Sequence, residues 1–263
     1  MPLQKKLPRR KLARVLVRPP TRLSHGATVI RNVLAEYGKL SRRDPIPKQY
    51  RHVINWGNPI DFTRAEGVNV YNPPNAVRNA IDKIVALQML KEAGVPTPEF
   101  STAPPVERGK NAIWLARSTV SGSSGAGITI VREGDAFPAV PLYVKYIRKL
   151  EEIRVHVFQD RAILCQYKKR VADQEQTADQ KLIRNYKNGW VFCPRDVETL
   201  SNDITTAAIN AVKVLGLDFG AVDMVIGKTD NLPYVLEVNT APGLDSPSSI
   251  KAWGDAFKEK LNL

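Results

Sequence analysis

The segment at residues 234–243, YVLEVNTAPG, constrains the fold of this chain more than any other. Its apolar run predicts a short buried strand over residues 234–238 that leads directly into a turn. Glu237 and Asn239 interrupt the run two residues apart, and because side chains alternate between faces along a strand, both point the same way. Burying a carboxylate without a partner is costly. The pattern therefore predicts either a bound cation at the end of this strand or a strand with one face open to water.

A second predicted strand, at residues 220–226, carries Asp223 within an otherwise apolar run. Only the turn at residues 227–231 separates it from the first segment, so the two strands are expected to pair as antiparallel neighbours. Asp223, Glu237 and Asn239 would then converge on one face. Carboxylate and amide oxygens, without histidine or cysteine, suit Mg²⁺ or Mn²⁺ better than zinc. Magnesium held by few protein carboxylates usually completes its coordination with phosphate and water, so the cluster points to a phosphate-bearing ligand.

A glycine–serine segment at residues 121–127, SGSSGAG, lies between strands predicted at residues 113–117 and 128–131. Glycines let the backbone approach a ligand closely, and exposed N–H groups and hydroxyls can cradle phosphate oxygens. The segment lacks the lysine of a Walker A loop and precedes a strand instead of a helix, which excludes the Walker A and Rossmann patterns. An ordinary flexible hairpin loop is the alternative. Combined with the oxygen ligands, the segment predicts a magnesium–nucleotide site.

Basic side chains are needed opposite a metal–phosphate centre to offset the phosphate charge. Each one taken alone is also compatible with a solvated surface charge. The candidates near predicted strand ends, near helix starts or in the polar segment at residues 168–189 are Lys83, Arg117, Lys145, Arg154, Lys168, Arg170 and Arg184.

The net charge of +13 is concentrated at the N-terminal end of the chain. Residues 1–51 carry fourteen Lys or Arg against two acidic residues, whereas the remaining 212 residues are almost neutral. This asymmetry predicts an acidic partner for the N-terminal region, such as nucleic acid, a phosphorylated molecule or an acidic protein. For residues 1–12, a solubilising and partly disordered tail is the alternative.

Composition excludes several classes of protein. With 43% hydrophobic and 25% charged residues over 263 positions, the chain is typical of a globular protein with one large or two smaller domains. No run of apolar residues is long enough to predict a transmembrane helix, and no apolar segment of a secretory signal follows the basic N-terminus. The isolated Cys165 and Cys193 form no zinc set with the three histidines, so two reduced thiols in a cytoplasmic protein are expected.

The periodicity of apolar residues predicts a small α/β unit followed by a longer mixed region. A break at residues 72–75, NPPN, separates the two. Loops are expected at residues 39–48, which are basic and contain proline, and at residues 168–189, which are polar and poorly patterned. The expected helices are residues 24–37, 76–93, 197–215 and 247–261, and the other expected strands are residues 13–18, 52–57, 68–71, 142–147, 153–158 and 162–167.

Five motifs in a particular order make the chain similar to a known superfamily. They are Asp82-Lys83 with GVPTP at residues 94–98, SGSSG at residues 121–125, YVKYI at residues 143–147, EIRVHV at residues 152–157, and Asp223 with EVNTAPG at residues 237–243. Together they resemble the motifs of the ATP-grasp superfamily of carboxylate–amine ligases. The segment around Arg184 is similar to that of the glutamate ligases that modify ribosomal protein tails.

The resemblance implies a fold of the α/β class, an α+β ATP-grasp architecture. After the basic tail at residues 1–12, a small α/β domain at residues 13–75 would precede an ATP-grasp domain at residues 76–263. The grasp domain would consist of two subdomains, divided near residues 142–147, that enclose a nucleotide.

The resemblance also implies ATP and Mg²⁺ (or Mn²⁺) as cofactors and roles for individual residues. The implied metal ligands are Asp223, Glu237 and Asn239. The implied nucleotide-binding residues are Lys83, Arg117, Ser123 and Ser124 at the phosphates, the backbone of Lys145 and Ile147 at the adenine, and Glu152 at the ribose. The implied catalytic cations are Arg154, Lys168 and Arg184, of which Arg184 would approach the transferred phosphate.

Two departures from the family pattern refine this picture. The family usually has Lys-Pro where this chain has Arg117-Ser118, so the positive charge is kept with a different geometry. D-alanine–D-alanine ligases carry an arginine two residues before the first metal aspartate, where this chain has Ala221. The second departure favours the glutamate-ligase-like branch.

The activity implied by the resemblance is ATP-dependent ligation of a carboxylate, such as an amino acid, to an amine acceptor through an acylphosphate. The sequence identifies neither substrate. Two alternatives stay open. An ATP-grasp kinase of an anionic small molecule would share the nucleotide site. A non-catalytic nucleic-acid-binding protein would account for the basic N-terminal region but not for the complete set of oxygen ligands.

Overall fold

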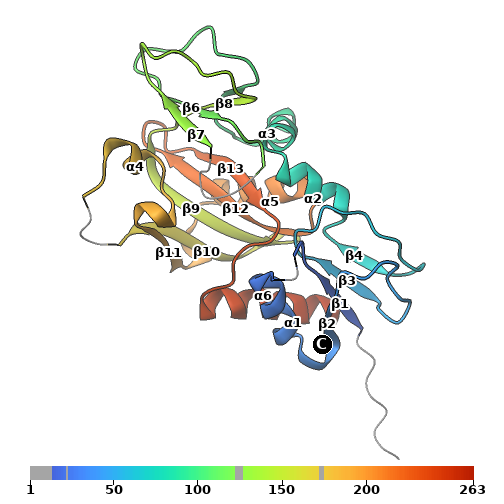
Figure 1. The fold of residues 1–263 in the computed structure, drawn as a ribbon. Helices are drawn as coiled ribbons and strands as arrows, with labels where there is room; N and C mark the ends of the chain where they lie inside the picture. Colours follow the sequence, from blue (N-terminus) through green and yellow to red (C-terminus); the bar gives the residue numbers. More distant parts are fainter. Residues whose placement is uncertain (1–13, 22, 122–126, 172–174) are drawn as a thin grey trace, which may run out of the picture.

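The computed structural model describes residues 14–21, 23–121, 127–171 and 175–263. Within these ranges the chain forms three β-sheets and the helices that cover them (Figure 1). One sheet is parallel and two are antiparallel. The predicted tail at residues 1–12 and the two serines Ser123 and Ser124 lie outside the described residues.

The parallel sheet belongs to the N-terminal part of the chain. Its strands are β1 (Val15–Arg18), β2 (Gly38–Leu40), β3 (His52–Asn55) and β4 (Asn69–Tyr71), in the spatial order β2-β1-β3-β4. The helix α1 (His25–Val33) connects β1 to β2 and ends earlier than expected, because Ala35 has a positive φ of 46°. The strand β2 lies where the sequence predicts the start of a loop, because a three-residue edge strand has almost no apolar pattern.

The last helix, α6 (Pro247–Leu261), packs against this first sheet and lies beside α1 (Figure 1). Its bounds agree with the expected helix, and the Ser246 hydroxyl caps it by accepting from the Ser249 N–H. Trp56, which follows β3, meets Trp253 of α6 edge-on at a centroid distance of 5.3 Å. Buried aromatic contacts of this kind join the two ends of the chain into one core.

The helix expected at residues 76–93 is two helices, α2 (Pro74–Ile81) and α3 (Lys83–Glu92). The apolar periodicity continues through the break, which is why the sequence predicts one helix. Asp82 leaves the helical conformation, with ψ of 108°, and its carboxylate accepts from the N–H groups of Ile84 and Val85. Asp82 therefore begins a new helix as its N-cap, and Lys83 becomes the first residue of α3.

The central sheet has five antiparallel strands. They are β9 (Lys149–Phe158), β10 (Arg161–Arg170), β11 (Trp190–Arg195), β12 (Phe219–Gly227) and β13 (Pro233–Asn239), in the order β11-β10-β9-β12-β13. The predicted hairpin of β9 and β10 is confirmed, with Gln159 at a positive φ of 55° in its turn. The helix α5 (Asn202–Val214) covers one face with α2 and α3 and buries Ala208 and Ala211 there.

The long loop expected at residues 168–189 is shorter and more structured than predicted. The strand β10 extends to Arg170, a short helix α4 (Ala178–Leu182) follows, and β11 begins directly after the segment. None of the α4 residues is buried, so no apolar period marks the helix in the sequence. The start of the predicted helix at residue 197 is a 3₁₀ turn, Val197–Thr199, ahead of α5.

The third sheet, here called the small sheet, stands above the central one in Figure 1. Its antiparallel strands are β5 (Phe100–Ser101), β6 (Trp114–Arg117), β7 (Ile128–Val131) and β8 (Leu142–Lys145), in the order β5-β8-β6-β7. The chain passes from β8 in this sheet to β9 in the central sheet through residues 146–148. This crossing places the two sheets on either side of the candidate site.

Candidate active site

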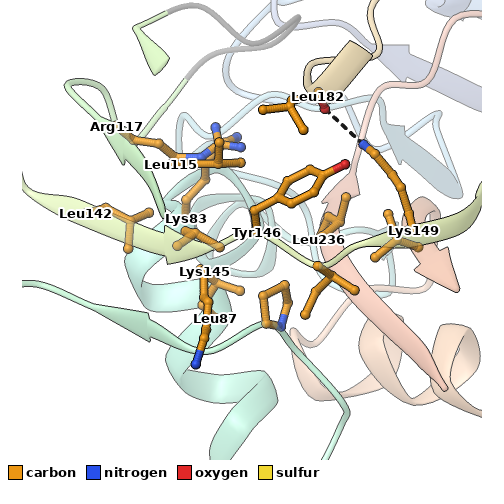
Figure 2. Close-up of a pocket in the computed structure, with 14 residues that line it drawn as sticks. Lys83, Leu87, Leu115, Arg117, Leu142, Lys145, Tyr146, Lys149, Leu182 and Leu236 are labelled. Carbon is orange, nitrogen blue, oxygen red and sulfur yellow. Dashed lines mark hydrogen bonds between the residues drawn. The ribbon is translucent and has the colours of Figure 1, made fainter. Parts of the chain in front are cut away.

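A pocket lies between the small sheet and the central sheet, where the chain crosses from β8 to β9 (Figure 2). Its walls are mostly apolar, and several cations stand around them. The lining residues are Lys83, Leu87, Pro98, Leu115, Arg117, Leu142, Val144, Lys145, Tyr146, Ile147, Lys149, Leu182, Val225 and Leu236. A largely apolar pocket with a few polar groups is the usual form of an organic ligand site, and the cations suit a ligand that carries negative charge.

Several of these lining residues carry no signal in the sequence. Lys149 lies between two motifs and looks like an ordinary linker residue, and Leu182 belongs to a segment without apolar period. Tyr146 belongs to the YVKYI motif, but the resemblance assigns its side chain no role. Leu236 precedes Glu237 on β13, but strand alternation alone does not predict that the Leu236 side chain lines a ligand pocket. These residues come together because α3, α4, β12 and β13 all border the crossing from β8 to β9.

The three predicted metal ligands do lie on neighbouring strands. β12 and β13 pair as antiparallel strands with Asp223 opposite Glu237 and Ala221 opposite Asn239, which confirms the predicted pairing. Directly opposed residues share a face of the sheet, and so do residues two apart on one strand. The two carboxylates and the amide therefore stand on the same face at the end of β13.

Each carboxylate of this group has a cationic partner. The Arg154 guanidinium donates from Nε and from a terminal nitrogen to the two Asp223 oxygens at 2.6 and 2.8 Å. The Lys83 ammonium lies 3.0 Å from Glu237 Oε2. Burial by itself would raise the pKa of Asp223, but the Arg154 guanidinium outweighs it and holds that pKa below the usual value. Asp223 is therefore a charged carboxylate inside the protein.

The donor set fits a hard divalent cation. Two carboxylates and one amide on one face are oxygen ligands of the kind that Mg²⁺ and Mn²⁺ prefer. Asn239 Oδ1 accepts from the Ala241 N–H at 2.9 Å, which fixes the orientation of the amide. In the described ranges of the chain no three His, Cys, Asp or Glu side chains gather as a metal site, in keeping with a set that has two carboxylates and an asparagine.

Two cations, Lys83 and Arg117, lie close to Glu237. Lys83 is mostly buried at the start of α3, and its backbone N–H donates to the Val120 carbonyl at 3.0 Å, just before the glycine–serine segment. Arg117 ends β6, and burial lowers its pKa while the negative charge of Glu237 opposes the shift. The structure thus brings Lys83, Arg117 and Arg154 together around Asp223 and Glu237.

The predicted ribose ligand, Glu152, lies in a second cluster. Its carboxylate is buried between Lys149 and Lys168, which both donate to it. Lys149 was not expected as a site residue. In the sequence Lys149 is simply one of two neighbouring basic residues, with Arg148, between the strands expected at residues 142–147 and 153–158, and only the fold buries its side chain.

The other predicted residues are placed differently. Lys145 and Ile147 line the pocket, but the Lys145 N–H donates to the Glu99 carbonyl and its ammonium pairs with the exposed Glu99 carboxylate at 2.7 Å. Arg184 lies with its guanidinium 4.4 Å from the centre of the Trp190 ring, and its buried Nε has no hydrogen-bond partner among the described residues. Arg170 ends β10 on the exposed side of the chain.

His156, on β9 of the central sheet, is buried and has a hydrogen-bond partner on each ring nitrogen. The Trp253 Nε1–H donates to His156 Nδ1 at 2.9 Å, so the neutral ring carries its proton on Nε2 and donates it to Gln166 Oε1 at 2.9 Å. Burial is the main cause that lowers the pKa of His156 from 6.5 to about 4. His156 is therefore a neutral structural residue that links β9, β10 and α6.

This histidine predicts a pH dependence of stability. Between pH 6.5 and about 4 the unfolded chain protonates His156 while the folded chain does not, so the free energy of unfolding should fall as the pH is lowered. The complete shift in the pKa of His156 corresponds to a change of about 3 kcal/mol in the free energy of unfolding. Urea unfolding of the wild type and of His156→Gln from pH 7 to pH 4.5 measures it, and the wild-type curve should be steeper. Parallel curves would contradict the assignment.

Both cysteines are free thiols, as expected, and neither lines the pocket. Burial raises the pKa of Cys165 to about 11, so this thiol stays protonated and is a poor nucleophile. Across the residues that the structure describes, no helix combines the length and apolar character needed to cross a lipid bilayer.

Comparison with known sequences identifies related proteins. Residues 141–257 match the family described as D-ala D-ala ligase C-terminus. A probable alpha-L-glutamate ligase of Shewanella loihica is 25% identical over 197 residues, which cover 68% of this chain and 62% of the relative. A protein of the same description from Haemophilus influenzae is 28% identical and covers 71% and 64%. The chain thus spans a little over three fifths of the length of these curated relatives.

Comparison with solved structures gives the same fold. The ATP-grasp ligase PsnB complexed with minimal precursor, Mg and ADP has a TM-score of 0.64 at 16% identity, covering 92% of this chain and 96% of that one. A D-alanine–D-alanine ligase from Bacillus anthracis has a TM-score of 0.63 at 16% identity, covering 95% and 96%. The chain has the ATP-grasp fold, and the resemblance to ATP-grasp carboxylate–amine ligases predicted from the sequence is confirmed.

Proposed function

We propose that this chain, which has the ATP-grasp fold, is an ATP-dependent carboxylate–amine ligase that acts through an acylphosphate. The observation that carries the proposal is that Lys83, which lines the pocket, pairs with Glu237 of the charged group at the end of β13. The apolar side chains around Leu87 and Leu236 suit a planar base, while Lys83 and Arg117 stand on the way to Glu237. A nucleotide matches this arrangement, because its apolar base would meet the apolar side chains and its anionic phosphates would meet the cations.

Asp223, Glu237 and Asn239 would hold Mg²⁺ or Mn²⁺ in this proposal. When bound, the ion would supply positive charge that orients the phosphates and stabilises the transition state of phosphoryl transfer. Lys83 and Arg117 would add charge at the phosphates from the other side. Arg154 holds Asp223 in place through two hydrogen bonds, which fixes the ligand before the ion arrives.

The proposed chemistry has two steps. A substrate carboxylate attacks the γ-phosphorus of ATP, and ADP leaves with the electrons of the broken P–O bond. An amine then attacks the acyl carbon of the acylphosphate, phosphate leaves, and the amine proton passes to a base or to solvent. The protein has to neutralise phosphate charge, align the two substrates and exclude water, and no covalent enzyme intermediate is needed.

The substrates are proposed at the level of chemical class. The curated relatives are described as glutamate ligases, and one structural neighbour was solved with a peptide precursor, which supports an amino acid or a peptide as substrate. None of the comparisons supports a nucleic-acid partner. The basic residues 1–51 remain consistent with an acidic or phosphorylated acceptor.

A substrate screen tests the proposal. The purified chain with MgATP is offered amino acids, dipeptides and polyamines singly and in pairs, and released ADP is measured together with the mass of the products. Ligation predicts ADP release that needs both a carboxylate and an amine, with one amide formed per ADP. A phosphorylated product from a single substrate would replace the proposal with a kinase. Salt-dependent nucleic-acid binding without turnover would replace it with a binding function.

A further inference from the structure

We propose that Lys149 is a positioning residue for the nucleotide: with Lys168, it ties the lid segment, residues 177–188, over the pocket through one buried carboxylate, Glu152. The inference rests on the proposed function in one respect, which is that the ligand of the pocket is a nucleotide. The hydrogen bonds that tie the lid segment to the body do not depend on which ligand binds.

The centre of this tie is a buried cluster of three charges. Lys149 Nζ donates to Glu152 Oε2 at 2.8 Å, and Lys168 Nζ donates to Glu152 Oε1. The side chains of Lys149 and Glu152 are only 8% and 7% exposed. One carboxylate between two ammonium groups leaves one net positive charge inside the protein. A buried charge is stable only when its remaining donors find acceptors, so the spare N–H groups of the lysines need partners.

Those partners are backbone carbonyls of the lid segment. Lys149 Nζ donates to the Leu182 carbonyl at 3.2 Å, and Lys168 Nζ donates to the Arg184 carbonyl at 2.5 Å. The carbonyl between them, that of Ile183, accepts from Asn188 Nδ2 at 2.7 Å within the lid. Carbonyls at a helix C-terminus have no partner inside the helix, and these three begin at Leu182, the last residue of α4. Three consecutive carbonyls thus each accept a hydrogen bond from a side chain. Two of these side chains, those of Lys149 and Lys168, belong to the body of the protein.

The lid segment has other contacts near its C-terminal end, where the Arg184 guanidinium lies 4.4 Å from the centre of the Trp190 ring and the Trp190 N–H donates to the Asn185 carbonyl at 3.2 Å. Its helix α4 is held less firmly. None of the residues of α4 is buried, and the capping box of Thr177 and Gln180 is internal to the lid. A further ion pair to the body, Arg132 with Asp179, is exposed, and such pairs contribute little. Segments with few apolar contacts open at low free-energy cost. The two lysines therefore supply the buried polar contacts that fix the C-terminal end of α4 to the body.

The lid position matters to the pocket because Leu182 is one of its lining residues. Figure 2 shows the hydrogen bond from Lys149 to Leu182 running beside the Tyr146 ring, and the Lys149 ammonium lies 5.5 Å from the centre of that ring. Losing the tie would free this wall of the pocket. A nucleotide would then be held less tightly, and water would reach the acylphosphate.

Lys149 has few donors left for a direct role at the phosphates, because two of its three N–H groups are already used. Burial lowers the pKa of this ammonium, Glu152 opposes that shift, and nearby Arg184 and Lys168 lower it further. The ammonium thus depends on Glu152. Glu152→Gln should loosen the lid in the same way as loss of Lys149, which gives a second variant for the test.

The first test uses hydrogen exchange in the nucleotide-free protein. Lys149→Met removes the ammonium and keeps the apolar stem, and amides of residues 178–188 should exchange at least about tenfold faster than in the wild type. Lys149→Arg should restore most of the protection, because it keeps a cationic donor. Lys181→Met is the matched control, since Lys181 lies in the lid with an exposed side chain. Unchanged exchange in both Lys149→Met and Glu152→Gln would overturn the proposal.

The second test separates positioning from simple support of the fold. In Lys149→Met the KM for ATP should rise about tenfold, and the ratio of ADP released to amide formed should climb above one, because water competes for an unshielded acylphosphate. Lys149→Arg and Lys181→Met should keep a ratio near one. A ratio near one in Lys149→Met would contradict the proposal. If the wild type forms no amide, the proposed function fails, and the exchange measurement still decides whether Lys149 holds the lid.

Discussion

Glu237→Gln should lower ATP turnover at least about 100-fold while the protein still folds, as expected when a group that stabilises a transferring phosphate is lost. Glutamine has the shape of glutamate and can still accept a hydrogen bond from Lys83, but it lacks the negative charge that a divalent cation needs. The Glu237 side chain is 31% exposed and its ion pair with Lys83 spans 3.0 Å. Loss of a partly exposed pair changes stability by about 1 kcal/mol or less.

The measurement is ADP release at saturating ATP over a range of Mg²⁺ concentrations, alongside a thermal unfolding curve. Binding of Mn²⁺ to the protein, followed by its paramagnetic signal, gives a readout that does not need activity. Asn239→Asp, which alters the third proposed ligand, should also lose turnover. Glu259→Gln is the control, since Glu259 pairs with Arg161 on the surface. Wild-type turnover in both Glu237→Gln and Asn239→Asp would rule out the metal assignment.

Arg154→Met should destabilise the fold by about 3–5 kcal/mol, the usual cost of removing one partner of a buried ion pair. The side chains of Arg154 and Asp223 are 16% and 11% exposed, and their two hydrogen bonds are well aligned. The Arg154 guanidinium also lies 4.2 Å from the centre of the Phe192 ring, so the variant loses a second contact. The larger share of the loss comes from Asp223, whose buried carboxylate would lose its two hydrogen bonds and its main counterion.

Urea unfolding at pH 7 measures this loss, and two comparisons identify its cause. The double variant Arg154→Met with Asp223→Asn should recover most of the stability, because no buried charge remains. Arg161→Met is the matched control, since it breaks an exposed pair and should cost no more than about 1 kcal/mol. Added Mg²⁺ should stabilise Arg154→Met more than the wild type if Asp223 is a metal ligand. A loss within 1 kcal/mol for Arg154→Met would refute the prediction.

Much of the charged end of the site could be predicted because it depends on local pattern. The strands β12 and β13 are apolar runs joined by a short turn, so their antiparallel pairing follows from chain connectivity. Period-two alternation then sets Glu237 and Asn239 on one face, and the pairing register sets Asp223 beside them. The terminal helix α6 could be predicted equally well, because a serine cap and a regular apolar period mark it.

Two edge strands escaped prediction. β2 has only three residues, too few for an apolar pattern, and β11 begins with an apolar run but directly follows the polar segment expected to be a loop. The break at Asp82 lies inside a continuous apolar period, so the pattern favours one helix where the aspartate cap makes two. In each case the local signal is weak or is outweighed by a hydrogen bond that only the folded chain forms.

The sequence by itself determined the residue types and the spacing of the oxygen ligands, because strand geometry converts a two-residue interval into a shared face. Tertiary structure alone decided which cations meet them. Arg154 reaches Asp223 across 69 positions of the chain, through a register of β9 against β12 that no local pattern encodes. Lys149 was likewise turned into the pocket by the crossing between two sheets. Buried charges from distant parts of the chain can pair only once the sheets have packed together. Tertiary structure therefore determines these pairs.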